Sequence, residues 1–235
     1  MAATTQEAHP VVIAIDGPSG TGKSSTSKAV AARLGLDYLD TGAQYRAITW
    51  WMLSGGIDIH DPAAVAAAAS KPEIVSGTDP LAPAITVDGT DVSGPIRGQD
   101  VTAAVSAVSA VPEVRSRITR LQRTLAAGAP RGIVAEGRDI GTTVLPDADL
   151  KIFLTASPEA RAARRSNELK GNGGTPGVAA TREALLKRDA ADSGRTTSPL
   201  AKAGDAIEVD TTELTLEQVI ERVIGLVEER KQRVR

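Results

Sequence analysis

The sequence predicts an α/β fold with a mostly parallel sheet of five strands, covered by helices on both faces. Short apolar segments rich in β-branched residues alternate with longer segments whose apolar residues recur at helical spacing. The first of these apolar segments leads directly into a glycine-rich turn that ends in Gly-Lys-Ser. At 235 residues the chain is long enough for one such domain with insertions, or for two small lobes.

The first elements are a buried strand at residues 11–16, a phosphate-loop pattern at residues 17–24 and a helix at residues 24–34. In this context the backbone N–H groups of the loop and the positive end of the helix point at one anion. We expect Lys23 to reach the β- and γ-phosphates of a nucleotide and the Ser24 hydroxyl to hold a magnesium ion. The alternative is a glycine-rich turn with a surface lysine, but the strand, the glycines, the lysine and the hydroxyl are all in place.

The next segment combines helices with a few short strands. Gly35 is expected to end the first helix in a left-handed conformation, and Asp40 or Thr41 to cap the second helix. Asp88-Gly89 is a hairpin signal between strand-like runs, so we expect a small antiparallel inset. The expected elements are a strand at 35–40, helices at 41–53 and 61–70, strand-like runs at 73–75, 84–87 and 91–93, and two helices within 101–127 that divide at Pro112.

The rest of the chain returns to the alternation of strands and helices. A third buried strand ends in Gly137-Arg138-Asp139, and two basic helices are joined by a glycine-rich connection. The expected elements are strands at 132–136, 151–154 and 206–209, helices at 161–169, 182–190 and 216–227, and the glycine-rich connection at 171–177.

Composition excludes several function classes. The net charge is -2, which provides no general attraction to nucleic-acid polymers or anionic membranes. Cysteine is absent, so disulfides, thiol catalysis and thiolate metal sites are excluded, and two isolated histidines are too few for a histidine-based zinc site. Neither a secretory signal nor an apolar run of about 20 residues is present. We therefore expect a cytoplasmic protein without membrane contact.

Two nucleotide-binding classes lack their signatures in this sequence. The Asn-Lys-x-Asp segment of guanine-specific GTPases does not occur, and neither does a His-Arg-Asp catalytic loop of protein kinases. Residues 91–94 match the Asp-x-x-Gly spacing of GTPases, but they fall in the expected antiparallel inset and not at the end of a core strand.

Arginines stand near the ends of several expected core elements. Arginine suits bidentate contacts to phosphate, although a single arginine is more often a solvated surface charge. Arg138 departs from that expectation because it follows a buried strand, at the edge where open α/β sheets bind ligands. Arg188 and Asp192 have the spacing of a helix ion pair, which leaves a structural and a functional interpretation open. Arg161, Arg164 and Arg165 fit a basic surface or a mobile lid.

Six motifs together resemble a known family. From Ile13 to about Val223 the chain resembles the bacterial cytidylate kinases of the nucleoside-monophosphate kinase group. The motifs are Ile15-Asp16-Gly17-Pro18-Ser19-Gly20, Asp40-Thr41-Gly42-Ala43-x-Tyr45-Arg46, Asp91-Val92-Ser93-Gly94-x-Ile96-Arg97, Gly137-Arg138-Asp139-x-Gly141-Thr142, Arg188-Asp189-x-x-Asp192 and Ser198-Pro199-Leu200. The resemblance implies transfer of the γ-phosphoryl group of ATP, with magnesium (Mg2+), to cytidylate or deoxycytidylate.

The resemblance also implies a domain organisation. It predicts a P-loop three-layer fold with a five-stranded parallel core sheet, a small antiparallel inset in the monophosphate-binding lobe, and a helical lid. We expect a flexible tail at 1–10 and a kinase domain at 11–235. Within that domain the core covers 11–40, 128–157 and 200–235, the monophosphate-binding lobe about 41–127, and the lid about 158–199. The expected partners are small-molecule nucleotides, and the expected oligomeric state is a monomer.

The family's functional residues fall on matching positions of this chain. The implied catalytic residues are Lys23, Arg138, Arg188 and Arg195, with Ser24 as metal ligand. The implied ATP-binding residues are Gly17, Pro18, Ser19, Gly20, Thr21, Gly22, Lys23, Ser24, Ser25 and Arg164. The implied acceptor-binding residues are Thr41, Tyr45, Arg46, Ser106, Arg115, Arg138, Asp139, Arg188, Asp192 and Arg195. Among these, Ser106, Arg115 and Asp139 fall where the family binds the cytosine base, and Arg46 falls where it binds the acceptor phosphate.

Some positions leave alternatives open. Ser109 offers a second hydroxyl near the matched Ser106, and Lys187 stands where an acidic residue often precedes the Arg-Asp pair. A P-loop kinase for another small acceptor, such as uridylate or shikimate, is a rival interpretation, and a nucleotide-dependent binding switch is a rival from another class. A panel of acceptors separates these possibilities, because only a kinase releases ADP in response to its acceptor.

Overall fold

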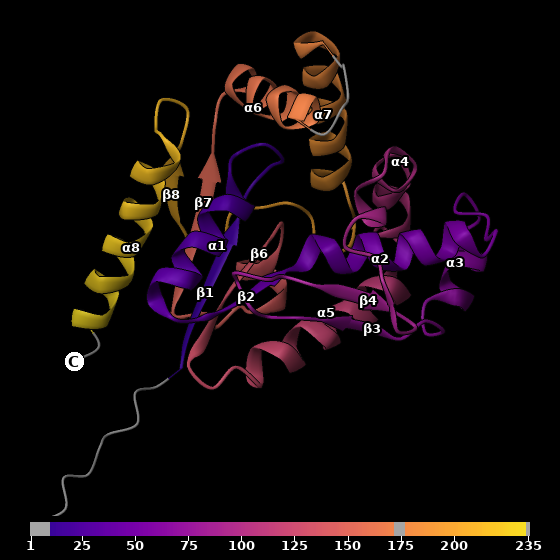
Figure 1. The fold of residues 1–235 in the computed structure, drawn as a ribbon, viewed down its shortest axis with the longest axis horizontal. Coiled ribbons are helices and arrows are strands. Elements are labelled where there is room, and N and C mark those ends of the chain that lie inside the picture. The colour runs from indigo at the N-terminus through magenta and orange to yellow at the C-terminus, as the bar shows by residue number, and fades with distance from the viewer. Residues whose placement is uncertain (1–9, 172–176, 234–235) are drawn as a thin grey trace, which may run out of the picture.

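The five predicted core strands form one parallel sheet. The computed structural model of the chain describes residues 10–171 and 177–233, so the predicted tail before residue 10 and most of the glycine-rich connection lie outside the described residues. In space the strands follow the order β2-β6-β1-β7-β8 (Figure 1). Their bounds are Val11–Asp16 for β1, Asp37–Asp40 for β2, Gly132–Gly137 for β6, Leu150–Thr155 for β7 and Ile207–Asp210 for β8.

The register of the strands brings their carboxyl ends to one edge of the sheet. Ile15 of β1 pairs with Glu136 of β6, and Asp40 of β2 pairs with the same glutamate. On the other side of β1, Asp16 pairs with Phe153 of β7. Because all five strands are parallel, the segments that follow each of them start from this edge, where open α/β sheets bind ligands.

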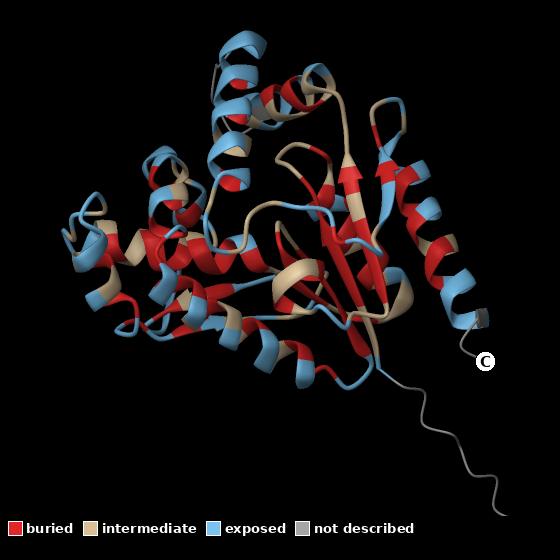
Figure 2. Cartoon of the chain, turned by 180° about the vertical axis from the view of Figure 1, so that it is seen from behind, coloured by how far each residue is buried: buried red, intermediate tan, exposed pale blue. Residues whose placement is uncertain are grey.

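Helices cover both faces of the sheet, as the buried apolar strands require. Side chains alternate along a strand, so Ile13 and Ile15 point to one face and Ala14 to the other. The first face packs against α1 (Lys23–Leu34) and α8 (Leu216–Arg233), and the second against α5 (Pro112–Ala127) and the π-helical turn η2 (Ile140–Val144). Figure 2 shows the sheet as largely buried between these layers.

The segment between β2 and β6 forms a lobe with its own apolar core. Its elements are α2 (Thr41–Ser54), α3 (Pro62–Ala68), β3 (Ile74–Ser76), β4 (Ile85–Val87), β5 (Thr90–Asp91), the 3-10 turn η1 (Pro95–Arg97) and α4 (Gln99–Val108), and its core also takes residues from α5. The predicted antiparallel inset is confirmed as a separate sheet of order β3-β4-β5. The predicted third strand is wrong in extent, because the Asp91 carboxylate accepts the Ser93 N–H at 2.9 Å and turns the chain.

Two helices, α6 (Pro158–Gly171) and α7 (Val178–Ser193), follow β7 and extend the molecule beyond the carboxyl edge of the sheet (Figure 1). They pack against each other, and most of the surface of α7 is exposed (Figure 2). The predicted basic helices at these positions are therefore confirmed. They lie over the edge at which β1 leads into the glycine-rich turn.

Substitution of Gly132 tests how tightly β6 is held against β1. Gly132 has φ +105°, and a Cβ atom there would lie 2.1 Å from the Val11 carbonyl oxygen. We expect Gly132→Ala to lower the free energy of unfolding by about 3 kcal/mol, because both the positive φ and the overlap must be relieved. Urea denaturation measures this change.

Gly225 provides a matched control on α8, because a Cβ atom there meets nothing within 4 Å. We expect Gly225→Ala to raise stability by up to about 1 kcal/mol through helix propensity. Equal effects of the two substitutions would contradict the overlap at Gly132.

Candidate active site

The phosphate-loop residues form the turn between β1 and α1, as the sequence predicts. Lys23 is buried, and its ammonium donates to the Pro18 carbonyl oxygen of the same turn at 2.7 Å. Burial, followed by the charge of Arg138, holds the pKa of Lys23 well below its usual range. Ser24 and Ser25 are exposed in the first turn of α1, where a ligand can reach their hydroxyls. This charge and these hydroxyls provide an anion site at a helix N-terminus.

Two buried carboxylates lie behind the loop, and sequence reasoning assigned no role to either. Asp16, at the end of β1, accepts the N–H groups of Ile140 and Gly141 at 2.9 and 2.8 Å. Burial raises the pKa of Asp16 to about 6, although these two bonds oppose the rise. Glu136, at the end of β6, accepts the Tyr38 hydroxyl at 2.5 Å. The signal that could have found both is an acidic residue at the carboxyl end of an apolar strand.

Glu136 lies in contact with Ser24, the predicted magnesium ligand. Burial, followed by the charge of Asp40, raises the pKa of Glu136 above its usual range, and a hydrogen bond with Ser24 opposes that rise. The carboxylate therefore lies next to the hydroxyl that was predicted to hold magnesium. An oxygen pair of this kind suits a hard divalent cation.

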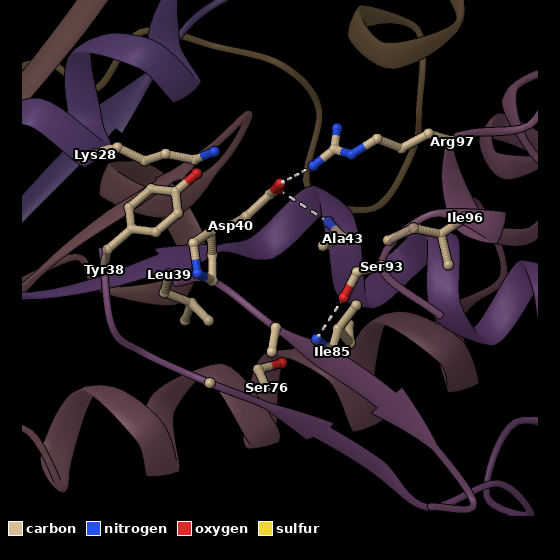
Figure 3. A pocket seen from close by; sticks show the side chains of 13 residues that line it. Lys28, Tyr38, Leu39, Asp40, Ala43, Ser76, Ile85, Ser93, Ile96 and Arg97 are labelled. Atoms are coloured by element: carbon tan, nitrogen blue, oxygen red, sulfur yellow. Dashed lines mark hydrogen bonds and ion pairs between the residues drawn. The ribbon is translucent and has the colours of Figure 1, made fainter. Parts of the chain in front are cut away.

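Asp40 connects the sheet edge to the lobe (Figure 3). Its carboxylate caps α2 by accepting the Ala43 N–H at 2.9 Å, which resolves the predicted choice of cap in favour of Asp40. Its other oxygen lies 3.5 Å from the exposed Arg97 guanidinium. The neighbouring cavity has a volume of only about 40 Å³, which is far below the size of a nucleotide site.

Three guanidinium groups surround the buried carboxylate of Asp192 on α7. Arg138, directly after β6, donates to Asp192 Oδ2 at 3.0 Å. Arg195 lies 3.7 Å from Oδ1, and Arg188 lies 4.0 Å from Oδ2. Three positive charges share one negative charge, so this Asp192 cluster (Arg138, Arg188, Arg195 and Asp192) carries a positive excess that suits an anion.

Arg138 also joins the cluster to the phosphate loop. Its Nη1 atom donates to the Gly17 carbonyl oxygen at 3.0 Å, while its Nε atom holds Asp192. Burial, followed by the charge of Arg138, lowers the pKa of Arg188 to about 9. The loop and the arginines therefore belong to one charged site.

Arg46 reaches the site from the lobe. Its Nη1 atom donates to the Ile96 carbonyl oxygen at 3.1 Å and to the Thr102 hydroxyl at 2.9 Å. Burial lowers its pKa to about 10, and the positive charges of Arg165, Arg97 and Arg138 add to the fall, whereas Asp40 opposes it. Arg46 is thus held by the lobe in the same positive field.

A second polar group lies beside the Asp192 cluster and contains the residues predicted to bind the acceptor base. Arg115 is buried and donates to Asp139 Oδ2 at 2.5 Å and to the Ser109 carbonyl oxygen at 3.1 Å. The Arg115 guanidinium lies 5.1 Å from the centre of the Tyr45 ring. The Arg195 Nη1 atom lies 3.5 Å from the Ser109 hydroxyl, so the two groups are contiguous.

Other predicted residues take less direct positions. The Ser106 carbonyl accepts the Ser109 hydroxyl at 3.2 Å, so in this structure Ser109 makes the contact with Arg195. Thr41 donates its hydroxyl to the Glu136 carbonyl oxygen at 2.6 Å, behind the site. Arg164 donates to the Thr211 hydroxyl at 2.9 Å, in the turn after β8. The role predicted for each of these residues stays a prediction.

The excess positive charge predicts stabilisation by an oxyanion. We expect 10 mM sulfate to raise the free energy of unfolding by about 1 to 2 kcal/mol relative to chloride at equal ionic strength, which corresponds to a concentration roughly tenfold above the dissociation constant. Arg188→Ala should remove more than half of this gain, whereas Arg182→Ala, on the exposed side of the same helix, should keep it. Thermal or urea denaturation measures the gain in stability. An equal gain in both variants would refute a sulfate site at the cluster.

A buried strand, a phosphate loop and a facing group of arginines at the carboxyl edge of a parallel sheet define a P-loop phosphotransferase. Comparison with known proteins specifies the class further. The cytidylate kinase family profile matches residues 13–229. The chain is 78% identical over 221 residues to a cytidylate kinase of Streptomyces avermitilis, with 94% of each chain covered. It is 54% identical to a cytidylate kinase of Nocardia farcinica, with 94% of this chain and 95% of the relative covered.

The chain belongs to the cytidylate kinase family, so the predicted resemblance is confirmed. A solved structure of an uncharacterized protein from Eubacterium ventriosum is similar in fold, with a TM-score of 0.51 at 13% identity, over 94% of this chain and 99% of that chain. Among the described residues, no helix is long and apolar enough to cross a membrane.

Proposed function

We propose that the protein transfers the γ-phosphoryl group of ATP to cytidylate or deoxycytidylate, giving the diphosphate and ADP. Arg138 carries the proposal, because it donates both to Gly17 of the phosphate loop and to Asp192 of the arginine cluster. A donor phosphate on the loop and an acceptor phosphate on the cluster would meet at this side chain. Family membership supports cytidylate as the acceptor.

The donor side consists of the loop and its lysine. Lys23 bonds to the Pro18 carbonyl at 2.7 Å, and we propose that ATP phosphates replace that carbonyl as its partner. The exposed hydroxyl of Ser24 and the adjacent carboxylate of Glu136 fit a magnesium ion. When bound, magnesium neutralises charge on the donor phosphates.

On the acceptor side, the reaction requires positioning of the acceptor phosphate and does not require a general base. A phosphate monoester is largely ionised at neutral pH, so its oxygen is already a nucleophile, which fits a site built from arginines and carboxylates. We propose that Arg46, Arg188 and Arg195 bind the acceptor phosphate and ribose and that Arg138 stabilises the charge on the transferring group. In-line placement of the two phosphates then provides most of the rate enhancement.

The pair formed by Arg115 and Asp139 supports recognition of cytosine. Cytosine presents an exocyclic amino donor, which matches a carboxylate acceptor, whereas uracil presents a carbonyl at the same position. A buried carboxylate facing that carbonyl would be left unmatched, and such mismatches discriminate strongly between ligands. Both side chains are almost fully buried.

A panel of acceptors tests the proposal. Cytidylate, deoxycytidylate, uridylate, adenylate and shikimate are each incubated with the protein, ATP and magnesium, and ADP release is measured by a coupled assay. We expect the cytidine nucleotides to give the highest kcat/KM. A higher kcat/KM for uridylate or shikimate would indicate another small-molecule kinase. ATP binding with no acceptor-dependent ADP release would indicate a nucleotide switch.

A further inference from the structure

Ser19 of the phosphate loop is held from outside by side chains of both α6 and α7. Arg161 of α6 donates through Nη1 to the Ser19 carbonyl oxygen at 3.1 Å. Asp189 of α7 accepts the Ser19 N–H through Oδ1 at 3.4 Å. The other oxygen of Asp189 accepts the same Arg161 Nη1 atom in an ion pair. Both backbone polar groups of one loop residue are therefore paired with a single arginine–aspartate pair.

The contact is closely packed as well as polar. The Arg161 side chain is only 5% exposed and that of Asp189 17%. A Cβ atom on Gly20 would lie 3.0 Å from both the Cβ atom and the carbonyl oxygen of Arg161. Gly20 also has φ +82°, which favours glycine, so the backbone of α6 lies directly against the turn.

The charge of this pair matters for the donor site. A lone carboxylate at the phosphate loop would repel a triphosphate, and the low local dielectric would strengthen the repulsion. Paired with Arg161, the Asp189 carboxylate is neutralised and still accepts the Ser19 N–H. None of the roles assigned above to the motif Arg188-Asp189-x-x-Asp192 uses Asp189.

We propose that Arg161 and Asp189 are positioning residues that fix the phosphate loop for ATP and couple α6 and α7 to it. The inference rests on the proposed function, because it concerns the donor nucleotide of that reaction. The neutral pair sets the loop conformation through Ser19, and α7, which supplies Asp189, also carries Arg188 and Asp192 of the acceptor site. The placement of α6 and α7 therefore acts on the donor and acceptor sites together.

A second ion pair between the same helices provides a matched control. Arg182 of α7 donates to Glu159 of α6 at 3.1 Å, and both side chains are largely exposed. Among the described residues, neither Arg182 nor Glu159 forms a hydrogen bond or ion pair with the phosphate loop. Loss of this pair therefore reports a general effect on the packing of the two helices.

The test is a double-mutant cycle read by the dissociation constant of ATP, with Arg161→Gln, Asp189→Asn, the double variant and the control Glu159→Gln. We expect Arg161→Gln to weaken ATP binding about tenfold, because it leaves an unpaired carboxylate beside the phosphates. The double variant should recover about threefold of that loss, because the carboxylate is gone as well. Glu159→Gln should change ATP binding by less than about twofold.

A second measurement requires no nucleotide. Hydrogen exchange of the Ser19 amide is expected to accelerate about tenfold in Asp189→Ala, which removes the acceptor oxygen, and to remain unchanged in Glu159→Gln. This exchange measurement also tests the proposed role of the Arg161–Asp189 pair if Arg161→Gln does not fold. Additive losses in the double variant, or equal Ser19 exchange in Asp189→Ala and Glu159→Gln, would overturn the inference. Failure of the wild-type protein to bind ATP would instead overturn the proposed function.

Discussion

Replacing Lys23 by alanine is expected to lower kcat by about 100- to 1000-fold, which is the usual effect of removing one charged group from a transferring phosphoryl site. The Lys23 ammonium lies within the phosphate loop, on the Pro18 carbonyl. We expect this ammonium to stabilise the negative charge that develops on the donor phosphates. No neighbouring side chain can do so from the same place. Because the effect is confined to charge stabilisation, KM for cytidylate should change by less than about threefold.

The same substitution should leave the fold intact. Lys23 is 6% exposed, and burial lowers the pKa of its ammonium, so the charge opposes folding at neutral pH. We expect the melting temperature of Lys23→Ala to equal or exceed that of wild type. Steady-state kinetics and thermal denaturation of one preparation measure both effects.

Lys28→Ala is the matched control for this prediction. Lys28 lies five residues further along α1, with its ammonium 5.9 Å from the centre of the Tyr38 ring. We expect Lys28→Ala to keep kcat within about twofold of wild type, because this half-buried cation contacts an aromatic ring and not the loop. A Lys23→Ala enzyme whose kcat stays within about tenfold would contradict the assigned role of Lys23.

The fold could be predicted from the sequence because its signals are local. Apolar β-branched runs, helical spacing and the Asp88-Gly89 turn each act over a few residues, and most expected elements match the observed ones within about four positions. The last helix extends six residues beyond its expected end, and the turns η1 and η2 were not predicted. The strand order could not be predicted in this way. It places β1 between β6 and β7, which requires contacts between segments more than 100 residues apart.

Asp192 shows the same limit within the site. The spacing rule for helices identified Arg188 as its partner, yet that contact is 4.0 Å long. The shorter contact, at 3.0 Å, comes from Arg138, which is 54 residues away in sequence. Local spacing thus indicates a possible contact between Arg188 and Asp192, whereas the tertiary structure decides which arginine lies closest to Asp192.

Ser109 and Glu136 show what a motif match leaves out. The match placed Ser106 in the base site, but the hydroxyl that lies 3.5 Å from Arg195 belongs to Ser109, three residues further along the same helical segment. Glu136 precedes the Gly-Arg-Asp motif and was predicted only as part of a strand. Its contacts with Tyr38 and Ser24 depend on the neighbouring strand and on the loop, which no single segment contains.

Replacing Asp139 by asparagine is expected to lower kcat/KM for cytidylate by about 100- to 1000-fold, while the dissociation constant of ATP stays within about twofold. Asparagine keeps the shape of the side chain, and its oxygen can still accept from Arg115, so the buried pair is weakened without an empty cavity. The lost charge and the new amide donor both act against the amino group of cytosine.

The ratio of kcat/KM for cytidylate to that for uridylate is the sharpest measurement of this role. We expect it to fall in Asp139→Asn, because the asparagine amide can donate to the uracil carbonyl, whereas a carboxylate cannot. Asp205→Asn is the control, since it removes an exposed carboxylate paired with Lys151 at 2.8 Å, away from the site. Equal losses of cytidylate use and ATP affinity would show instead that Asp139 maintains the site as a whole.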